Sequence, residues 1–261
     1  MNSPKPERGW LKDTLLTLLV VGTLVTILCS WLAMSKQQGK REWEAAAEIE
    51  NLGGRVGRFN SAPSRWLGSY ASKWLESNDF FNHIYSVRLD PGRVTDDGLI
   101  TALSRLKDFR ELNSLCLNGT QVTDAGLEHL KGLDRLAWLW LRDTKVTDAG
   151  VGRLKGLSHL LELDLRGTMV TDAGLQYLEG LSQLMGLYLD GTKVTDAGLR
   201  HLEGLSQLRT LSLSGTQITD AGLERLKGLK KLRQLSLSGT KATDEGVKNL
   251  QRAFPNCWVE R

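Results

Sequence analysis

The stretch LSLSGTQITDAGLERLKGL, residues 211–229, contains short motifs that recur along the sequence at a fixed spacing, and this recurrence indicates the fold of the chain. Equivalent leucines recur every 24 residues, and a longer unit precedes them near Ile84. A period of this size is the signature of a solenoid, in which each repeat packs only against its neighbours. The sequence therefore predicts about seven repeats over residues 84–250. The regular units begin at Leu112, Leu136, Leu160, Leu184, Leu208 and Leu232.

Each unit combines a strand pattern with a helix pattern. Leu211 and Leu213 alternate as in a half-buried strand, whereas the leucines from Leu223 to Leu229 have helical spacing. Thr219 stands where a helix N-cap is favoured, and Asp220 suits the first helical turn. We therefore expect an α/β repeat in which a curved parallel sheet is backed by short outer helices.

Two sets of glycines recur in the units. A glycine within so short a helix, such as Gly222, costs about 1 kcal/mol relative to alanine, so its recurrence indicates close packing between neighbouring coils. The second set follows the helix, where a left-handed residue is common. We predict that conformation for Gly132, Gly156, Gly180, Gly204 and Gly228.

An apolar stretch near the N-terminus predicts a membrane anchor. Leu15–Met34 contains twenty residues without a charge, about the ~20 that a helix needs to cross a bilayer. A secretory signal peptide is the alternative, but its apolar core is usually about 7 to 15 residues long, and Ala33 and Ser35 form only a weak cleavage pattern. We expect a single-pass membrane protein with an extracytoplasmic soluble domain, although basic residues flank both ends equally and leave the orientation open.

The remaining segments complete the predicted domain organisation. Residues 1–14 form an N-terminal tail, residues 15–34 the transmembrane helix and residues 35–83 a helical linker with an N-terminal cap; the linker helix itself, residues 36–52, is interpreted as a spacer. A solenoid needs covered ends, and residues 251–261, with Phe254, Cys257 and Trp258, are predicted to cover the far one. The N-terminal cap is indicated by Phe59, Trp66, Trp74, Phe80, Phe81 and Ile84.

The repeat pattern resembles the leucine-rich repeat. A threonine stands in the place where that family commonly has Asn or Cys, and in the family this residue bonds the backbone of adjacent coils. The resemblance therefore implies a buried threonine ladder. The words GTxVTDAGLxxLxGL, the single anchor, IENLGGRVGRF and SNDFF together resemble bacterial, planctomycete-type membrane-anchored leucine-rich-repeat proteins, which implies no catalytic residues. The ladder positions are Thr120, Thr144, Thr168, Thr192, Thr216 and Thr240.

Composition argues against several classes of partner and cofactor. The 34 basic and 30 acidic residues are interspersed, so no stripe for nucleic-acid phosphates is present. The three cysteines lack the spacing of a zinc site or a disulfide framework, and the four histidines are not expected to converge with cysteines or carboxylates. We predict no cofactor, no metal and no enzyme activity.

Function is expected on the concave face, which we define as the strand positions that alternate with the buried leucines and point away from the helices. Its middle coils carry aromatic and charged residues of the kind that protein interfaces concentrate. We predict that this surface binds a protein or peptide. The predicted binding residues are Trp138, Trp140, Arg142, Glu162, Asp164, Arg166, Tyr188 and Asp190.

Other interpretations remain for the same residues. Glu162 and Asp164 could form an acid/base or metal pair, but Arg142 and Arg166 beside them favour solvated ion pairs. The aromatic side chains could also stack on one another and only stabilise the sheet. For the whole chain, the alternatives are an intracellular adaptor resembling F-box leucine-rich-repeat receptors for ubiquitination, and a structural envelope protein that self-associates.

Overall fold

The computed structural model describes residues 8–60, 82–92, 96–109 and 111–261. Contacts divide the chain into two compact units, one of Met1–Arg41 with Ser61–Asn82 and one of Glu42–Asn60 with His83–Arg261. We call the second unit the repeat unit. The aromatic residues Trp66, Trp74, Phe80 and Phe81, predicted to belong to the N-terminal cap, lie outside the described residues.

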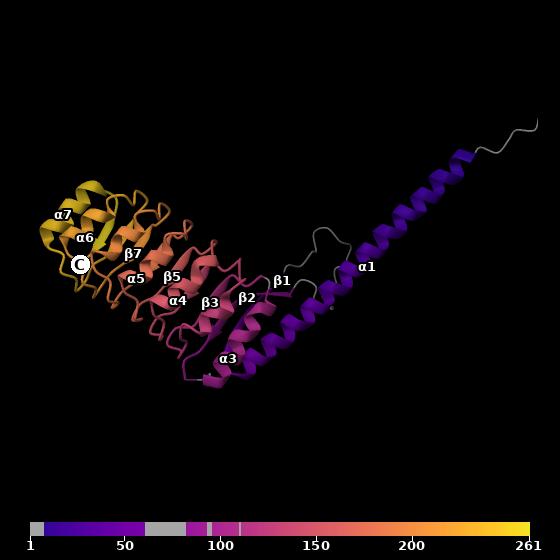
Figure 1. The fold of residues 1–261 in the computed structure, drawn as a ribbon, viewed down its shortest axis with the longest axis horizontal. Coiled ribbons are helices and arrows are strands. Elements are labelled where there is room, and N and C mark those ends of the chain that lie inside the picture. The colour runs from indigo at the N-terminus through magenta and orange to yellow at the C-terminus, as the bar shows by residue number, and fades with distance from the viewer. Residues whose placement is uncertain (1–7, 61–81, 93–95, 110) are drawn as a thin grey trace, which may run out of the picture. The chain divides into compact units, whose positions relative to one another are not determined.

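Strands that follow one another in sequence lie side by side in the repeat unit (Figure 1). Those from β2 to β9 are parallel, and in register the strand leucines of successive coils pair, as in Leu139 with Leu163. The pairing of Val87 with Leu115 confirms the longer first unit. The described strands are β1 (Gly54–Asn60), β2 (Asn82–Leu89), β3 (Ser114–Cys116), β4 (Trp138–Trp140), β5 (Glu162–Asp164), β6 (Gly186–Tyr188), β7 (Thr210–Ser212), β8 (Gln234–Ser236) and β9 (Trp258–Glu260).

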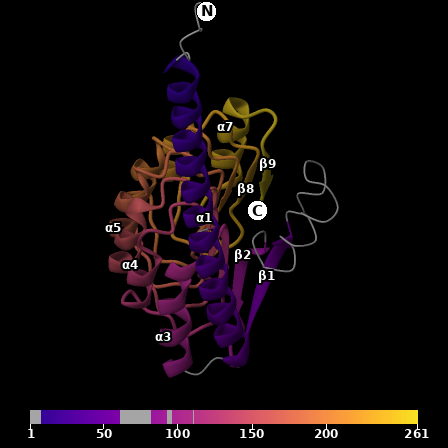
Figure 2. The ribbon, with the colours of Figure 1, turned by 90° about the vertical axis from the view of Figure 1, so that its right-hand side faces the viewer.

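Helices line the opposite side of each coil, as Figure 2 shows for α3, α4 and α5 relative to β1, β2, β8 and β9. Many of them are single turns of 3-10 helix, because few residues remain between strands and short connectors often take this tighter form. The α-helices are α1 (Arg8–Asn51), α3 (Asp96–Arg105), α4 (Asp148–Gly152), α5 (Asp172–Leu175), α6 (Asp220–Leu226) and α7 (Asp244–Ala253). The 3-10 turns are η1 (Leu106–Asp108), η2 (Gly126–Leu130), η3 (Arg153–Gly156), η4 (Gln176–Leu178) and η5 (Gly198–Leu202).

Buried leucines and a row of threonines form the interior of the stack. The leucines of the repeat pattern have almost no exposed surface, and the threonine row from Thr120 to Thr216 is buried with them. The implied bonding between coils is wrong, however. Each hydroxyl donates to a carbonyl oxygen three residues earlier in its own coil, as Thr168 Oγ1 does to Leu165 O at 2.6 Å.

A different threonine connects neighbouring coils. Asp172 Oδ1 accepts a hydrogen bond from the backbone N–H of Thr195 at 2.7 Å, and its Oδ2 accepts one from Thr195 Oγ1 at 2.6 Å. The same pair of bonds recurs from coil to coil, and we call the series the Asp–Thr ladder. Thr171 and Thr219 also confirm the predicted N-cap role, since each side chain accepts from an N–H of the helix that follows. The ladder joins Asp124 to Thr147, Asp148 to Thr171, Asp172 to Thr195, Asp196 to Thr219 and Asp220 to Thr243.

From Gly150 onward, the ladder explains the glycine within each helix. A methyl group at Gly198 would overlap Asp172 Oδ1 of the preceding coil, and the same holds at Gly222 for Asp196. The predicted close packing between coils is therefore confirmed.

The prediction for the glycine after the helix is wrong in most coils. Gly132 has a positive φ of 89°, but Gly156, Gly180, Gly204 and Gly228 do not. The helix ends remain right-handed, as at Glu203 and Lys227, because the chain leaves the last turn without reversing sharply. The left-handed glycines instead follow the strands, where the chain turns tightly before the threonine row; they are Gly119, Gly167, Gly191, Gly215 and Gly239.

Both ends of the stack are covered, though not entirely as predicted. At the first end, Ala45, Ala46 and Ile49 of α1 belong to the buried core, so the last part of the predicted spacer helix packs on the repeats. At the far end, Phe254 and Cys257 are buried as predicted. Trp258 is 57% exposed, because β9 continues the sheet and turns Val259 rather than Trp258 towards the core.

The predicted membrane span, Leu15–Met34, lies within α1. The side chains of residues 15–22 are outside the described residues. In the part of the chain that is described, no helix combines the length and the apolar character that a bilayer crossing requires.

Candidate functional site

The middle of the concave face is a connected group of aromatic and charged side chains. Trp140 Nε1 donates to Glu162 Oε1 at 3.0 Å, which joins β4 to β5. Arg166 Nε lies 2.9 Å and 3.0 Å from the two oxygens of Asp164, and its guanidinium lies 5.2 Å from the centre of the Tyr188 ring. These contacts preorganise the surface, because each side chain is held by another one from the same or the next coil.

The charged groups of this cluster alter one another's proton affinity. The hydrogen bond to Asp164 raises the pKa of Arg166 above its usual value, against the opposing effect of burial, so the guanidinium stays protonated. Burial raises the pKa of Tyr188, helped by the negative charge of Glu162. The phenol is therefore a neutral donor and acceptor at physiological pH.

One of the predicted ion pairs forms, but it is not fully solvated, and the other predicted pairings are wrong. Arg166 does pair with Asp164, but the Asp164 side chain has no exposed surface. Arg142 pairs with Asp143 in the following turn at 3.1 Å rather than with either strand carboxylate. Glu162 receives the indole N–H of Trp140 instead of a guanidinium. The close spacing of the strands places the indole, not an arginine, beside Glu162.

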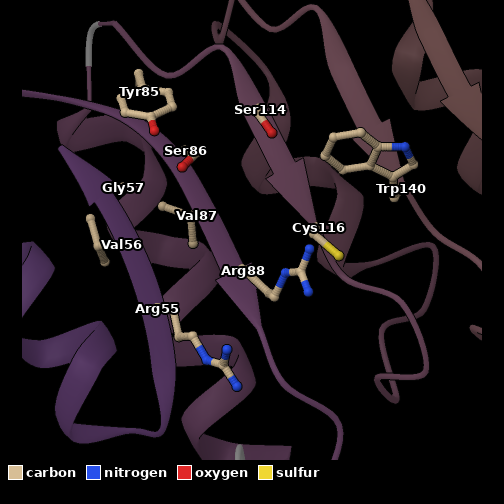
Figure 3. A pocket seen from close by; sticks show the side chains of 10 residues that line it. All are labelled: Arg55, Val56, Gly57, Tyr85, Ser86, Val87, Arg88, Ser114, Cys116 and Trp140. Atoms are coloured by element: carbon tan, nitrogen blue, oxygen red, sulfur yellow. The ribbon is translucent and has the colours of Figure 1, made fainter. Parts of the chain in front are cut away.

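A cavity of about 420 Å³ lies at the first end of the concave face. Figure 3 shows Arg88 of β2 reaching towards the Cys116 sulfur of β3, with the Trp140 ring beyond it. The Arg88 side chain is exposed and its guanidinium has no ion-pair or hydrogen-bond partner among the described residues. Arg55 of β1 also lines the cavity and pairs with Asp90 at 2.8 Å. The cavity therefore offers an unpaired cation beside an aromatic ring.

A second cavity, of about 300 Å³, lies over the later coils. Asp190 accepts a hydrogen bond at Oδ1 from Ser212 Oγ at 2.5 Å, and Glu260 accepts one from Ser236 Oγ at 3.1 Å. The other Asp190 oxygen, Oδ2, is buried and has no hydrogen-bond donor in the part of the chain described. Arg166 also lines this cavity, but its charge is paired with Asp164. The hydroxyls and the carboxylates of Asp190 and Glu260 therefore make the cavity suited to a cationic or hydrogen-bond-donating group.

Several residues of these cavities were not predicted as a site. Arg55 was missed because Gly54–Asn60 was not recognised as a strand that extends the sheet. Glu260 was missed because the C-terminal segment was interpreted only as a cap. Ser212 and Ser236 were not predicted as site residues, because their role depends on the carboxylates of Asp190 and Glu260 in the neighbouring coils. Arg55 and Glu260 could have been found from the alternation of side chains along the two edge strands, β1 and β9.

The predicted residues lie on or directly after three neighbouring strands of the sheet, β4, β5 and β6. No group of three or more His, Cys, Asp or Glu residues that could hold a metal ion occurs within the described residues. His201 Nδ1 contacts Glu179 Oε1 at 2.5 Å, so the expectation that no histidine meets a carboxylate is wrong for this pair. The pair joins two coils on the helix side, away from the concave face.

Comparisons with known proteins identify the repeat. A leucine-rich repeat region is matched over residues 96–258. The chain is similar to the structure of internalin C2 from Listeria monocytogenes, with 30% identity and a TM-score of 0.53, over 67% of this chain and 70% of that protein. A comparison with curated proteins finds no match.

Two further structures are less similar to this chain in sequence. A leucine-rich repeat protein of Leptospira interrogans is 21% identical, with a TM-score of 0.50, over 60% of this chain and 39% of that protein. An internalin, InlF, of Listeria monocytogenes is 21% identical with a TM-score of 0.49, over 67% of this chain and 60% of that protein.

Proposed function

This chain belongs to the leucine-rich repeat proteins, and we propose that it recognises a protein or peptide through the concave face without catalysing a reaction. Leucine-rich repeat proteins generally bind protein ligands. The observation that carries the proposal is the aromatic and charged group on β4, β5 and β6, which stays partly exposed although its members contact one another.

The chemistry of this group fits a binding surface. Tryptophan, tyrosine and arginine dominate the energy of protein interfaces when they are held rigidly near the centre of the contact. Trp138, Trp140 and Tyr188 are partly exposed, and Trp140, Arg166 and Tyr188 are held by the contacts described above. The alternative, that these side chains only stabilise the sheet, predicts no change in binding when one of them is removed.

Panning a phage library of random dodecapeptides on the full chain tests the proposal. We expect enriched peptides whose dissociation constants rise by roughly 30-fold in Trp140→Ala, because truncating a central tryptophan costs about 2 kcal/mol or more. Trp43→Ala is the matched control, since Trp43 is an exposed tryptophan that contacts Arg58 on β1 rather than the concave face. Equal binding to Trp140→Ala and the unmodified chain, with unchanged circular dichroism, would overturn the proposal.

We also propose that Leu15–Met34 anchors the chain in a membrane, with the repeat unit outside the cytoplasm. The support is the uncharged twenty-residue stretch and the resemblance to planctomycete-type anchored proteins. The chain should stay in the membrane pellet after alkaline carbonate extraction, and a chain lacking residues 15–34 should not. Protease added to intact cells should cut the repeat unit. Release of the full chain by carbonate would contradict the anchor, and protection from protease would contradict the orientation.

Self-association of the chain through the concave face is the alternative outcome to binding of a different protein or peptide. Trp258 is an exposed aromatic residue on the last strand of the sheet. If light scattering shows a dimer that Trp258→Ala or Trp140→Ala dissociates, the concave face serves contacts between copies of this chain.

A further inference from the structure

Charges on the concave face separate along the stack. At the concave-face positions from β1 to β4, three arginines face one carboxylate: Arg55, Arg88 and Arg142 against Asp90, with Asp143 beside Arg142 in the turn. From β5 to β9 the balance reverses, with four carboxylates and one arginine: Glu162, Asp164, Asp190 and Glu260 against Arg166. The first cavity lies in the basic half and the second in the acidic half.

Most of these charged side chains already have a partner, but two groups do not. Arg55 is held by Asp90, Arg142 by Asp143, and Arg166 by Asp164. Glu162 and Glu260 accept hydrogen bonds from Trp140 and Ser236. Among the described residues, the Arg88 guanidinium in the first cavity and the buried Oδ2 atom of Asp190 in the second have neither an ion-pair nor a hydrogen-bond partner. A buried acceptor without a donor is unfavourable, so a donor that enters the second cavity gains more there than elsewhere on the face.

Building on the proposed function, we propose that the bound partner is an extended peptide that crosses the strands, with an acidic side chain at Arg88 and a basic side chain at Asp190. Arginine binds a carboxylate through two parallel hydrogen bonds, and the cation of a lysine or arginine supplies donors to Asp190. Between them, apolar residues of the peptide lie against Trp140 and Tyr188.

The spacing of the strands fixes the spacing of the two charges in the peptide. Arg88 is on β2, and Asp190 follows β6, four strands later in the sheet. Neighbouring strands lie about 4.8 Å apart, which gives roughly 19 Å. An extended chain covers about 3.3 Å per residue, so the acidic and basic residues should be separated by about six positions.

The same charge pattern disfavours nucleic acid. A phosphate backbone needs a continuous row of cations, and the four carboxylates from β5 to β9 would repel it. A uniformly acidic peptide is disfavoured for the same reason, whereas a uniformly basic one is repelled in the first half.

Panning random dodecapeptide phage on the full chain and on Arg88→Glu tests the inference. The unmodified chain should enrich peptides with one acidic and one basic residue about six apart, and Arg88→Glu should lose the acidic preference. Lys131→Glu is the control, because Lys131 is exposed in the turn after η2 and has no ion-pair partner in the described part of the chain. Its selected peptides should match those of the unmodified chain.

A double-mutant cycle then assigns the contact. For one enriched peptide, Arg88→Ala and an alanine at the peptide's acidic residue should each weaken binding about fivefold, and together no more than either alone. The same cycle with Asp190→Asn and the basic residue should show coupling at the other end. Additive effects, or enriched peptides without the charge pattern, overturn this inference. If those peptides still depend on Trp140, the proposed function stands; if no peptide is enriched, both fail.

Discussion

The Asp–Thr ladder and the concave face use similar polar residues in opposite ways. In the ladder, each aspartate from Asp124 to Asp220 accepts hydrogen bonds from the equivalent threonine of the next coil, the last of which is Thr243. The same pair of bonds therefore forms in each of these coils. On the concave face each coil carries different side chains, and some groups, such as the Arg88 guanidinium, have no partner in the described part of the chain. Residues that recur in every coil therefore hold the coils together, whereas residues that vary between coils form the surface that is available for binding.

Placing a methyl group against the ladder should have the largest effect. In Gly198→Ala the new Cβ would overlap Asp172 Oδ1 and lie 3.1 Å from Asp172 Cα. Overpacking of this kind costs about 1 to 3 kcal/mol, and we expect the upper part of that range because the neighbour includes backbone. The midpoint of unfolding followed by circular dichroism checks it.

Gly204→Ala is the matched control, since no heavy atom beyond its own chain neighbours lies within 4 Å of the position that an added methyl group would take, and its φ is not left-handed. Alanine there should be neutral or stabilise the chain by up to about 1 kcal/mol. Equal destabilisation by both changes would show that the ladder does not restrict the glycine.

Removing one link of the ladder should have the next largest effect. Asp172→Ala removes both acceptors of Thr195 and leaves its N–H without a partner in the coil interface. We expect a loss of about 1 to 3 kcal/mol in the free energy of unfolding. Asp172→Asn keeps one acceptor and should lose less, while the exposed Asp134→Ala should change little. Denaturant titration measures all three, and an Asp172→Ala chain as stable as Asp134→Ala would contradict the ladder.

Acid should weaken the last link of the ladder. Hydrogen bonds from Thr243 lower the pKa of Asp220. Because the folded-state pKa is below the unfolded value of about 3.9, the link's full contribution is present above that pH and is lost as the pH falls through the lower folded pKa. The difference in unfolding temperature between the unmodified chain and Asp220→Asn should therefore shrink on acidification. A difference that stays constant down to pH values at which all carboxylates are protonated would exclude this linkage.

The smallest effect on stability is expected on the concave face. Arg88→Ala removes an exposed side chain whose guanidinium makes no ion pair within the described residues, so stability should change by less than about 0.5 kcal/mol. A loss comparable to that of Asp172→Ala would remove the contrast between the two regions. The same unfolding titration, run beside the peptide measurements, separates a binding effect from a folding one.

Prediction from sequence succeeded for the strand leucines, the capping threonine and the glycine packed between coils, and it failed where the backbone of the turn after the strand sets the contact. The alternation of Leu211 and Leu213 and the capping threonine Thr219 depend on neighbours a few residues away, and both are found in the structure. The bonding of the threonine row and the left-handed glycine were misplaced, because each depends on how the turn after the strand brings backbone groups together. The concave face was predicted as a set of positions, but the partners of Arg142 and Glu162 and the unpaired state of Arg88 were not.

The period, the parallel order of the strands, the buried leucines and the helix starts could all be predicted from the sequence. They follow from side-chain spacing along a repeating chain. Three features required the tertiary structure. The aspartate of each TDAG motif bonds to the next coil, and Asp164 is buried beside Arg166. Arg88 has no partner among the described residues and lies at a cavity partly formed by β1. The ladder bonds and the Arg88 cavity bring together residues more than twenty positions apart, which requires stacking of the coils, whereas Arg166 and Asp164 are two residues apart in one coil.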